Sequence, residues 1–280
     1  VTMGVVVNTN AASIAASRIL DANRKNLQST MEKLSSGKRI NSASDDAAGM
    51  AVAAKLRADV SSLNQSVRNA NDAVSLVNTY DGASSEVEAM LVRMRELAVQ
   101  STNGTYSSDD TGLASKEFVQ LQTEIDRISK NTTFNRQKIA NASVNSGSFT
   151  FRVGPQNGSV DDVTVVLADV GSSALGVSSS VVITNVASAS AAVSAIDTAI
   201  STLSSNRATA GAFVNRLGHT IANLQNVSQR TQEALSGIED TDYAAESAGL
   251  ARGMVLAQAG TAMLAQANQS PQYILALLKA

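Results

Sequence analysis

The chain has 280 residues, with 22 Lys and Arg against 24 Asp and Glu, a formal net charge of −2, one His and no Cys. The near-neutral balance excludes the dense basic surface that nucleic-acid binding requires, so we expect no nucleic-acid partner. The absence of Cys excludes disulfides and thiolate zinc sites, and it suits either a reducing compartment or a protein exported unfolded through a narrow channel.

Both ends of the chain are poor in charge. Residues 1–17 carry none, and residues 245–280 carry only Glu246, Arg252 and Lys279. Helices with so few charges, and with mostly Ala as apolar side chains, bury too little to be stable alone. We therefore expect the two ends to pair with each other and with copies from neighbouring chains. Because no basic group precedes an apolar run, and no run approaches the ~20 residues of a membrane span, we expect neither a cleaved secretory signal nor membrane insertion.

The first long helix is predicted by heptad spacing. Apolar residues recur at intervals of three and four, which places them on one helix face and is typical of a coiled-coil seam. The register consists of Ala53, Leu56, Val60, Leu63, Val67, Ala70, Val74 and Val77. At Asp81-Gly82 we expect a turn or a local kink, after which the stripe resumes until the turn signal at Asn103-Gly104. The later members are Val87, Met90, Met94 and Leu97.

A shorter helix and a β-hairpin follow. The helix is indicated by the helical spacing of Ala114, Phe118, Leu121, Ile125 and Ile128. Alternation with period two then predicts two strands around a Gly-Pro-Gln-Asn-Gly loop. Their apolar members are Phe149, Phe151 and Val153, then Val163, Val165 and Leu167.

The stretch between the hairpin and the next helix has no clear period. Val181 to Ile183 predict a third strand. Residues 172–192 are rich in Ser, Ala and Val and almost uncharged, which fits either a loose surface excursion or the frayed start of the next helix.

A second long helix has a heptad register that never slips. Arg207, Ser228 and Thr231 are its polar members, and every other position is apolar. The register is Val193, Ile196, Ile200, Leu203, Arg207, Ala210, Val214, Leu217, Ile221, Leu224, Ser228, Thr231, Leu235 and Ile238.

Residues with catalytic chemistry are few. His219 is the only histidine, and a lone His without positioned partners makes neither a triad nor a multi-histidine metal site. Asp45 and Asp46 are adjacent and so point in different directions on a helix, which favours N-capping over acid–base chemistry. The sequence contains no phosphate-binding glycine motif. We expect no enzymatic activity, cofactor or metal.

The sequence resembles the bacterial flagellins over about residues 1–170 and 190–280. Several long segments carry the resemblance, and they lie in both halves of the chain. They are Asn8-Thr9-Asn10, LSSGKRINSASDDAAG from Leu34, Arg68 to Asp72, MRELAVQS from Met94, Glu124 to Arg127, Asn215 to Leu217, IEDTDYAAE from Ile238, Gln258 to Gly260, and LAQANQSPQYILALL from Leu264. The segment Leu250 to Met254 is richer in Gly than the family pattern, which weakens a helix by ~1 kcal/mol per interior Gly.

The resemblance implies a mainly α fold with a small β-hairpin region, built as a long antiparallel helical coiled-coil bundle with its N- and C-termini paired. Residues 1–41 and 240–280 would form an inner coiled-coil domain, ordered only on assembly. Residues 42–185 and 186–239 would form an outer helical domain with the hairpin at about 148–168, and only about 20 low-complexity residues stand where other flagellins insert outer domains. Met3 lies where family members start, so Val1 and Thr2 are expected to be an upstream extension or an alternative start.

The implied function is a structural subunit that polymerises into the extracellular flagellar filament after unfolded export. The alternative is a hook–filament junction protein of the same design. Expected partners are other copies of the chain, an export chaperone, and the filament cap and hook-associated proteins. The candidate residues for polymerisation and chaperone binding are Leu264, Tyr273, Ile274, Leu275, Leu277 and Leu278.

The resemblance also implies an additional role as a ligand of the flagellin-sensing Toll-like receptor. The candidate contact residues are Arg93, Glu96, Leu97 and Glu117. Arg93, Glu96 and Leu97 have the spacing of one helix face, so we expect Leu97 to be the desolvated apolar anchor of a contact site with a charged rim. The other interpretation is that these side chains serve only contacts between subunits of a filament, and both can hold for one surface.

Overall fold

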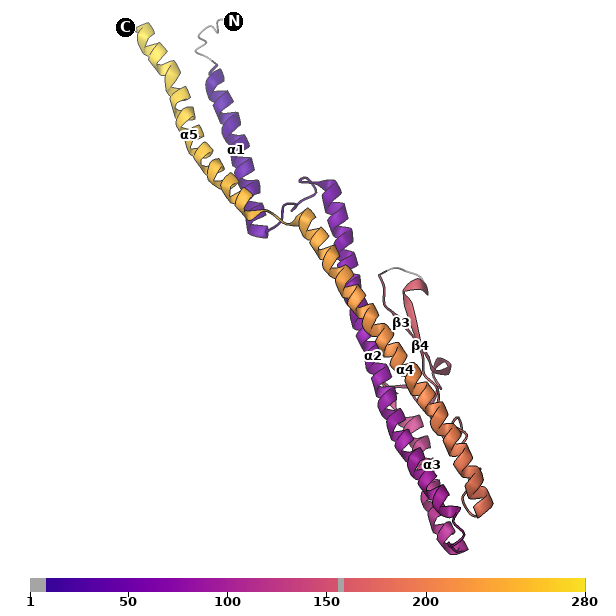
Figure 1. Cartoon of the computed structure of the whole chain (residues 1–280). Helices are drawn as coiled ribbons and strands as arrows, with labels where there is room; N and C mark the ends of the chain where they lie inside the picture. The colour runs from indigo at the N-terminus through magenta and orange to yellow at the C-terminus, as the bar shows by residue number, and fades with distance from the viewer. Residues whose placement is uncertain (1–8, 156–158, 280) are drawn as a thin grey trace. The chain divides into compact units, whose positions relative to one another are not determined.

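Figure 1 shows the chain as a computed structural model, which describes the backbone of residues 9–155 and 159–279. The helices are α1 (Ala11–Ser36), α2 (Ala47–Ser101), α3 (Ser108–Asn131), α4 (Val186–Glu239) and α5 (Tyr243–Lys279). The strands are β1 (Thr133–Phe134), β2 (Gln137–Lys138), β3 (Ser148–Arg152) and β4 (Asp162–Val166), with short 3₁₀ turns at Asn145–Gly147 and Ser159–Asp161. The mainly helical class with a small β component is therefore confirmed.

The contacts divide the chain into two compact units. The terminal unit consists of Val1–Ala58 and Arg230–Ala280, and the central unit of Asp59–Gln229. The sequence predicts boundaries at residues 41 and 240. The terminal unit extends beyond them, to include the first residues of α2 and the last residues of α4. The additional residues are tied to the terminal segments: Glu239 pairs with Lys38, whose Nζ lies 2.5 Å from its Oε1, and with Arg57, whose Nε lies 3.0 Å from its Oε2.

In the central unit, α2 and α4 run antiparallel and form the core with α3 and the hairpin (Figure 1). Two side-chain pairs fix their direction: Ser228 Oγ donates to Asn64 Oδ1 at 3.2 Å, and Arg95 Nε lies 2.6 Å from Asp197 Oδ1. Both predicted heptad registers are confirmed, because none of their members in α2 or α4 is exposed. Packing of these apolar faces, rather than helix propensity, supplies most of the stability of the two helices.

The turn or kink predicted at Asp81-Gly82 is wrong, because α2 continues through it. Tyr80 and Ser84 flank the dipeptide on the buried face, and both are fully buried. Packing of that face outweighs the ~1 kcal/mol that an interior Gly costs. Arg207, the charged member of the α4 register, lies opposite: its Nε is 2.8 Å from Asp81 Oδ1, and its Nη1 pairs with Glu88 one heptad further on.

The hairpin forms as the alternation predicts. Phe149 pairs with Val165, and Phe151 pairs with Val163, in an antiparallel ladder. The third strand predicted at Val181–Ile183 is wrong, since this stretch has no strand pairing and Ile183 instead buries its side chain in the core. Residues 186–192 form the start of α4, which agrees with one of the two alternatives for residues 172–192. The residues before them form turns, and Leu175, Val177 and Ile183 bury their side chains in the core, so this part is not a loose surface excursion.

Helix starts are set by capping groups. Asp46 Oδ1 accepts the Gly49 N–H at 2.8 Å, which confirms capping at the start of α2. Asp45 Oδ2 accepts the N–H groups of Ser42 and Asn41, and these bonds to the ionised form lower the pKa of Asp45. A short hairpin of two two-residue strands, β1 and β2, follows α3, and no pattern in the sequence predicted it.

Candidate interaction surfaces

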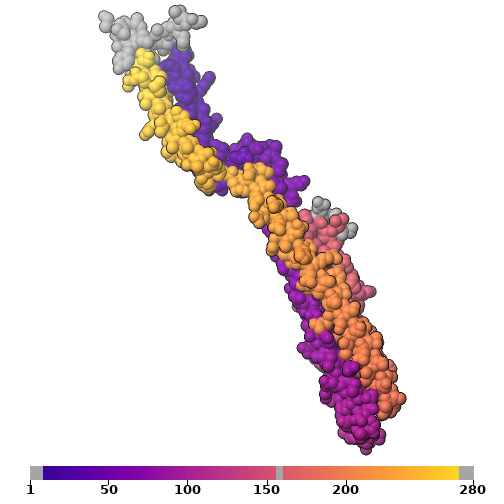
Figure 2. All heavy atoms as spheres, viewed as in Figure 1, coloured from indigo at the N-terminus to yellow at the C-terminus, as the bar shows by residue number. Residues whose placement is uncertain are grey.

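The terminal unit brings the two charge-poor ends of the chain together as predicted. Helices α1 and α5 lie side by side and antiparallel, so the first turns of α1 lie beside the C-terminal half of α5 (Figure 2). Leu20 packs against Gly260, and Leu27 packs seven residues further along against Gly253. A Cβ atom on Gly260 would lie 3.2 Å from Leu20 Cδ1, and one on Gly253 would lie 3.0 Å from Leu27 Cδ1. The glycines therefore allow close helix packing, which explains their presence inside α5.

Polar contacts fix the register of this helix pair. Asn10 Nδ2 donates to the Ala267 carbonyl at 2.8 Å, and Ser13 Oγ donates to Asn268 Oδ1 at 2.7 Å. The Asn10 side chain also caps α1 by accepting the Ser13 N–H. Towards the other end of the pair, Lys33 Nζ lies 3.8 Å from Glu246 Oε1. Each contact joins residues whose numbers sum to nearly the same value, so one antiparallel register holds along the pair.

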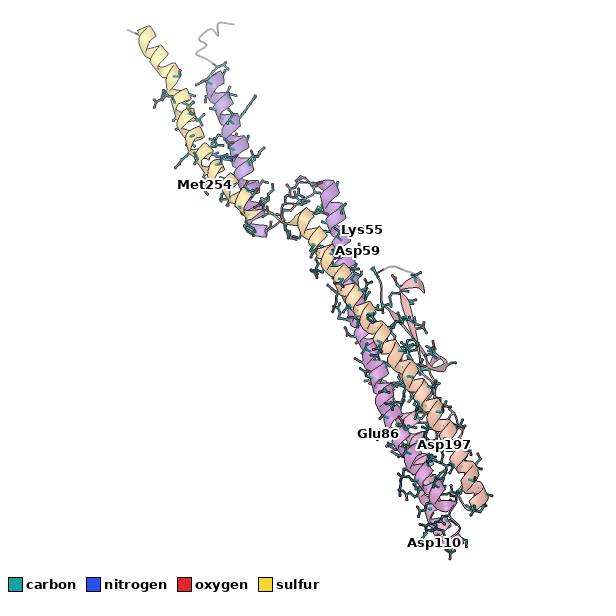
Figure 3. All side chains as sticks on the ribbon, in the orientation of Figure 1. Lys55, Asp59, Glu86, Asp110, Asp197 and Met254 are labelled. Carbon is teal, nitrogen blue, oxygen red and sulfur yellow. The ribbon has the colours of Figure 1, made fainter. Side chains whose placement is uncertain are left out.

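The helix pair leaves much apolar surface uncovered. Among the described side chains of α1 only Leu20 is buried, whereas Ile14, Ile19 and Met31 are exposed. On α5 the exposed large apolar residues are Tyr243, Met254, Val255, Leu256 and Met263. Met254 is labelled in Figure 3, where it projects from α5. Helices α1 and α5 thus carry apolar residues both where they contact each other and on their outer faces. The apolar residues of the outer faces need further partners to be buried.

The chain segments that join the helices of the terminal unit are held by a buried carboxylate. Glu239 is 4% exposed, and its two oxygens lie 2.5 Å from Lys38 Nζ and 3.0 Å from Arg57 Nε. The backbone adds bonds from Arg39 N–H to the Glu239 carbonyl and from Thr241 N–H to the Gly37 carbonyl. Gly37 ends α1 with a φ of 72°, a left-handed conformation that favours Gly. Two cations therefore neutralise one buried acid where these chain segments meet.

The charged members of the predicted receptor site do come together. Arg93 of α2 lies 2.9 Å from Glu96 one turn on, and its Nε lies 2.8 Å from Glu117 Oε1 of α3. All three side chains are about half exposed, and the bonds to Glu117 and Glu96 raise the pKa of Arg93. Leu97, however, is only 3% exposed, so its side chain is not at the surface where the apolar anchor of such a site would lie. Helix α3 brings Glu117 to Arg93, whereas Leu97 belongs to the buried core cluster.

The predicted C-terminal contact residues are only partly described. Leu264 is half-buried on the face of α5 that packs on α1. The α5 backbone is helical to Lys279, but the side chains of Tyr273, Ile274, Leu275, Leu277 and Leu278 lie outside the described residues.

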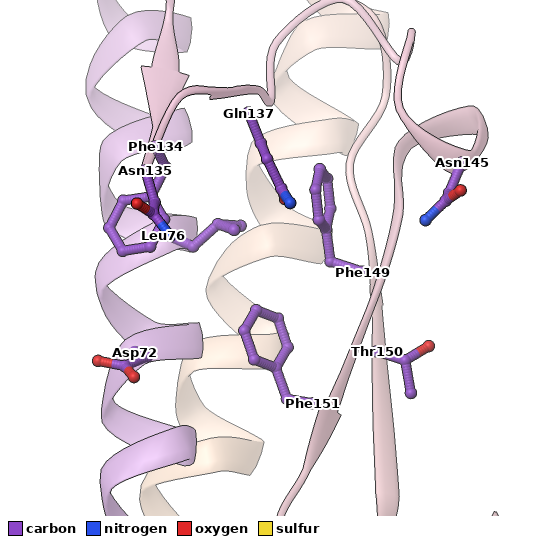
Figure 4. Close-up of a pocket in the computed structure, with 9 residues that line it drawn as sticks. All are labelled: Asp72, Leu76, Phe134, Asn135, Gln137, Asn145, Phe149, Thr150 and Phe151. Carbon is purple, nitrogen blue, oxygen red and sulfur yellow. The ribbon is translucent and has the colours of Figure 1, made fainter.

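A hollow that sequence reasoning missed lies beside β3. Phe149 and Phe151 project from β3 towards α2, where Leu76 forms part of the wall, and Phe134 of β1 closes another side (Figure 4). Its polar lining comes from Asp72, Asn135, Gln137, Asn145 and Thr150. The signal that could have indicated it is a concentration of aromatics, because three of the five Phe residues of the chain line this one hollow.

Neither a metal cluster nor a positioned catalytic group occurs in the described ranges. His219 is exposed on α4, and no group of three His, Cys, Asp or Glu could hold a metal ion among the residues described. By length and composition alone α4 is apolar enough to cross a membrane, which differs from the expectation drawn from uninterrupted apolar runs. Core helices pass the same test, and Ile196, Leu203 and Leu217 of α4 are fully buried in the central unit.

Comparison with known proteins gives consistent matches along the chain. Residues 7–144 match the family model of the bacterial flagellin N-terminal helical region, and residues 193–278 match that of the C-terminal helical region. A flagellin of Halalkalibacterium halodurans is 42% identical over 98% of this chain and 100% of its own length. The flagellar filament 31.3 kDa core protein of Treponema maltophilum is 36% identical over 98% and 100%. The crystal structure of Bacillus cereus flagellin has a TM-score of 0.49 and 33% identity, over 56% of this chain and 88% of that one.

Proposed function

The chain belongs to the bacterial flagellin family, and we propose that it polymerises into the flagellar filament through the outer faces of α1 and α5. It is a structural subunit of that filament and not an enzyme. The observation that carries the proposal is the uncovered apolar surface of the terminal helix pair. In a lone subunit this surface faces water, whereas neighbouring copies in a polymer would bury it.

The energetics favour burial in a polymer. Fully burying one Val, Leu or Met side chain contributes about 1.5–3 kcal/mol, and α5 alone exposes several such side chains. The helix pair is held internally by glycine contacts, a few hydrogen bonds and one long ion pair. Contacts from neighbouring subunits would therefore supply a large share of its stability, and ordering of the ends on assembly would consume part of that gain.

A charge placed on the outer face tests the proposal. Val255 is 65% exposed, so Val255→Glu should leave the folded monomer unchanged but abolish growth from filament seeds, because a polymer would have to bury the carboxylate. The matched control is Val186→Glu at the first residue of α4 in the central unit, where the side chain is 52% exposed. Electron microscopy should show filaments from the control and none from Val255→Glu. Normal filaments from both variants would refute this use of the α5 face.

The alternative within the same design is a hook–filament junction protein. The names of the similar proteins favour the filament subunit, since they are a flagellin and a filament core protein. Immunogold labelling of cells separates the two proposals: a filament subunit labels the whole length, whereas a junction protein labels only the base of the filament.

We further propose export of the chain to the cell exterior in an unfolded state, with a chaperone covering its C-terminal segment beforehand. The support is the apolar run from Tyr273 to Leu278, which invites aggregation unless it is covered, together with Leu264. Deleting residues from Leu264 onward should abolish chaperone binding in a pull-down, and retained affinity would place the binding site elsewhere. The filament cap and hook-associated proteins would then contact the exported chain at the two ends of the polymer.

The exposed cluster of Arg93, Glu96 and Glu117 supports a second proposed role, recognition of the free subunit by the flagellin-sensing Toll-like receptor. Leu97 would contribute only indirectly, as part of the core beneath this surface, because its side chain is buried. In the intact filament neighbouring subunits would cover this flank, so only the monomer would signal.

A reporter-cell assay tests the receptor proposal. The matched control for Arg93→Ala is Arg95→Ala two residues along α2, since Arg95 is equally exposed but pairs with Asp197 of α4 instead. Wild-type and Arg95→Ala monomers should signal, whereas Arg93→Ala monomers and intact filaments should signal far more weakly. Equal signalling by all four samples would show that this surface is not recognised.

A further inference from the structure

The methionines of this chain differ in exposure according to the helix that carries them. On α2, Met94 is completely buried, and Met50 and Met90 are half-buried. Three other methionines are exposed, namely Met31 of α1 at 48%, and Met254 and Met263 of α5 at 48% and 66%. Every exposed methionine that the structure describes therefore lies on the terminal helix pair, the surface proposed above for polymerisation.

Helical spacing places a methionine on two opposite sides of α5. Met254 and Met263 are separated by about two and a half turns, so their side chains point in opposite directions. Met254 projects from α5 (Figure 3) and lines a hollow with Leu20 and Leu27 of α1. On the other side, the exposed Leu256 lies two turns before Met263 and shares its face. A neighbouring copy that covers either side of α5 would therefore contact a methionine side chain.

Methionine supplies all the sulfur chemistry of the chain, because the sequence has no Cys. Peroxide oxidises an accessible methionine to the sulfoxide, which turns a flexible apolar side chain into a polar one. The sulfur lone pair attacks one oxygen of hydrogen peroxide, and an S–O bond forms while the O–O bond breaks. The second oxygen leaves as water, with the proton released from the first. The sulfur is oxidised and the peroxide is reduced, so the reaction needs no further component.

We propose that Met31, Met254 and Met263 are oxidation sites that control assembly: hydrogen peroxide converts them to sulfoxides in the free subunit, and the oxidised subunit no longer adds to a filament. A sulfoxide oxygen accepts hydrogen bonds, and burying it against an apolar neighbour leaves it unpaired. In a polymer, the copies that cover these side chains also exclude peroxide, so subunits already incorporated resist the dose that disables free ones. This inference rests on the proposed polymerisation and names a chemical control of the same surface.

Peptide mapping by mass spectrometry after treatment with hydrogen peroxide tests the assignment of the sites. In the free subunit, the three exposed methionines should each gain an oxygen atom at a low dose, while the buried Met94 stays unmodified and serves as the internal reference. In filaments given the same dose, oxidation of the three should be largely lost. Equal oxidation in subunit and filament, or oxidation of Met94 at the same dose as the exposed three, would overturn the proposal.

Seeded growth measures the effect on assembly. Oxidation of the wild-type subunit should raise the critical concentration for growth from seeds by at least about tenfold, which corresponds to losing the burial of one methionine side chain. Thermal melting of the central unit should stay unchanged, because its buried Met94 is intact. Methionine sulfoxide reductases for both sulfoxide epimers, supplied with a thiol reductant, should restore the original critical concentration. An unchanged critical concentration after oxidation, or no recovery after reduction, would overturn the proposal.

Replacing the sulfur atoms separates this effect from other oxidative damage. The triple variant Met31→Leu, Met254→Leu and Met263→Leu keeps the apolar volume and should assemble both before and after peroxide treatment. The matched control, Met50→Leu with Met90→Leu, removes half-buried sulfurs of α2 and should lose assembly on oxidation as the wild type does. Loss of assembly by the oxidised triple variant would overturn the proposal, and if that variant does not assemble untreated, the reductase experiment on the wild type decides. If the untreated wild type forms no filaments, the proposed polymerisation fails and this inference with it; filaments that form equally well from oxidised subunits remove only the inference.

Discussion

Replacing Leu217 by Ala is the sharpest test of the α2–α4 core. Leu217 lies in the confirmed heptad register of α4, and its side chain is completely buried in the core cluster with Leu63 and Leu224. Val67, Val74 and Ile221 are partly buried and pack against the same apolar cluster. Removing three carbon atoms from such a site loses their transfer free energy and leaves a cavity that rigid helices fill poorly.

The expected loss in the free energy of unfolding is about 3 kcal/mol, within the ~2–5 kcal/mol that buried Leu→Ala changes cost. For a unit of about this size, each kcal/mol lowers the melting temperature by about 2–4 °C, so Leu217→Ala should melt about 6–12 °C below the wild type in circular dichroism of the full chain. The matched control is Leu113→Ala on α3, because Leu113 is exposed and its truncation should change stability by less than about 0.5 kcal/mol. Equal melting of the two variants would show that the heptad register of α4 does not form the core.

Three further predictions concern polar groups. Arg207→Ala should lower the free energy of unfolding by about 1–2 kcal/mol in urea titrations, because Arg207 and its partners Asp81 and Glu88 are partly exposed, between a surface and a buried ion pair. In 1 M salt, which screens partly exposed charges, the stability difference between wild type and variant should be smaller. The capping bonds from Ser107 lower the pKa of Asp110 in the folded state, so this carboxylate stabilises the fold above the ordinary carboxylate pKa, and the stability is lost as pH falls through the folded pKa. Asp110→Asn should therefore flatten the loss of melting temperature in acid. Tyr80→Phe removes the hydroxyl that donates to the Ala168 carbonyl at 3.0 Å, and should cost about 1 kcal/mol in the same titration.

The apolar period predicts which helix faces are buried, but not all of their members. Ser66, Ser84 and Ser101 are buried in the α2 seam, where a hydrophobic pattern gives no signal. Each hydroxyl donates to the carbonyl four residues earlier, at 2.9, 2.8 and 2.9 Å, so no polar atom is left unpaired by burial. A serine that is satisfied within its own helix fits the core as a small residue, and only the structure reveals this.

The candidate sites were predictable to different degrees. The pairing of the two ends followed from their lack of charge, which requires a partner. Whether the Leu97 side chain is exposed could not be decided from its spacing to Arg93, because burial depends on which elements distant in the sequence pack on that face of α2. The β1–β2 hairpin escaped prediction since strands of two residues show no alternation, and its Asn135-Arg136 turn lacks the Gly that normally indicates such a turn.

Hydrogen exchange on monomers and filaments tests the central claim most directly, namely that the terminal helices complete their packing only in the polymer. In the monomer, the amides of α1 and α5 should exchange rapidly, while the segment from Ile196 to Leu217 in the core of α4 stays protected and serves as the internal reference. In the filament, both terminal helices should become as protected as that segment. Equal exchange of α1 and α5 in monomer and filament would contradict the account.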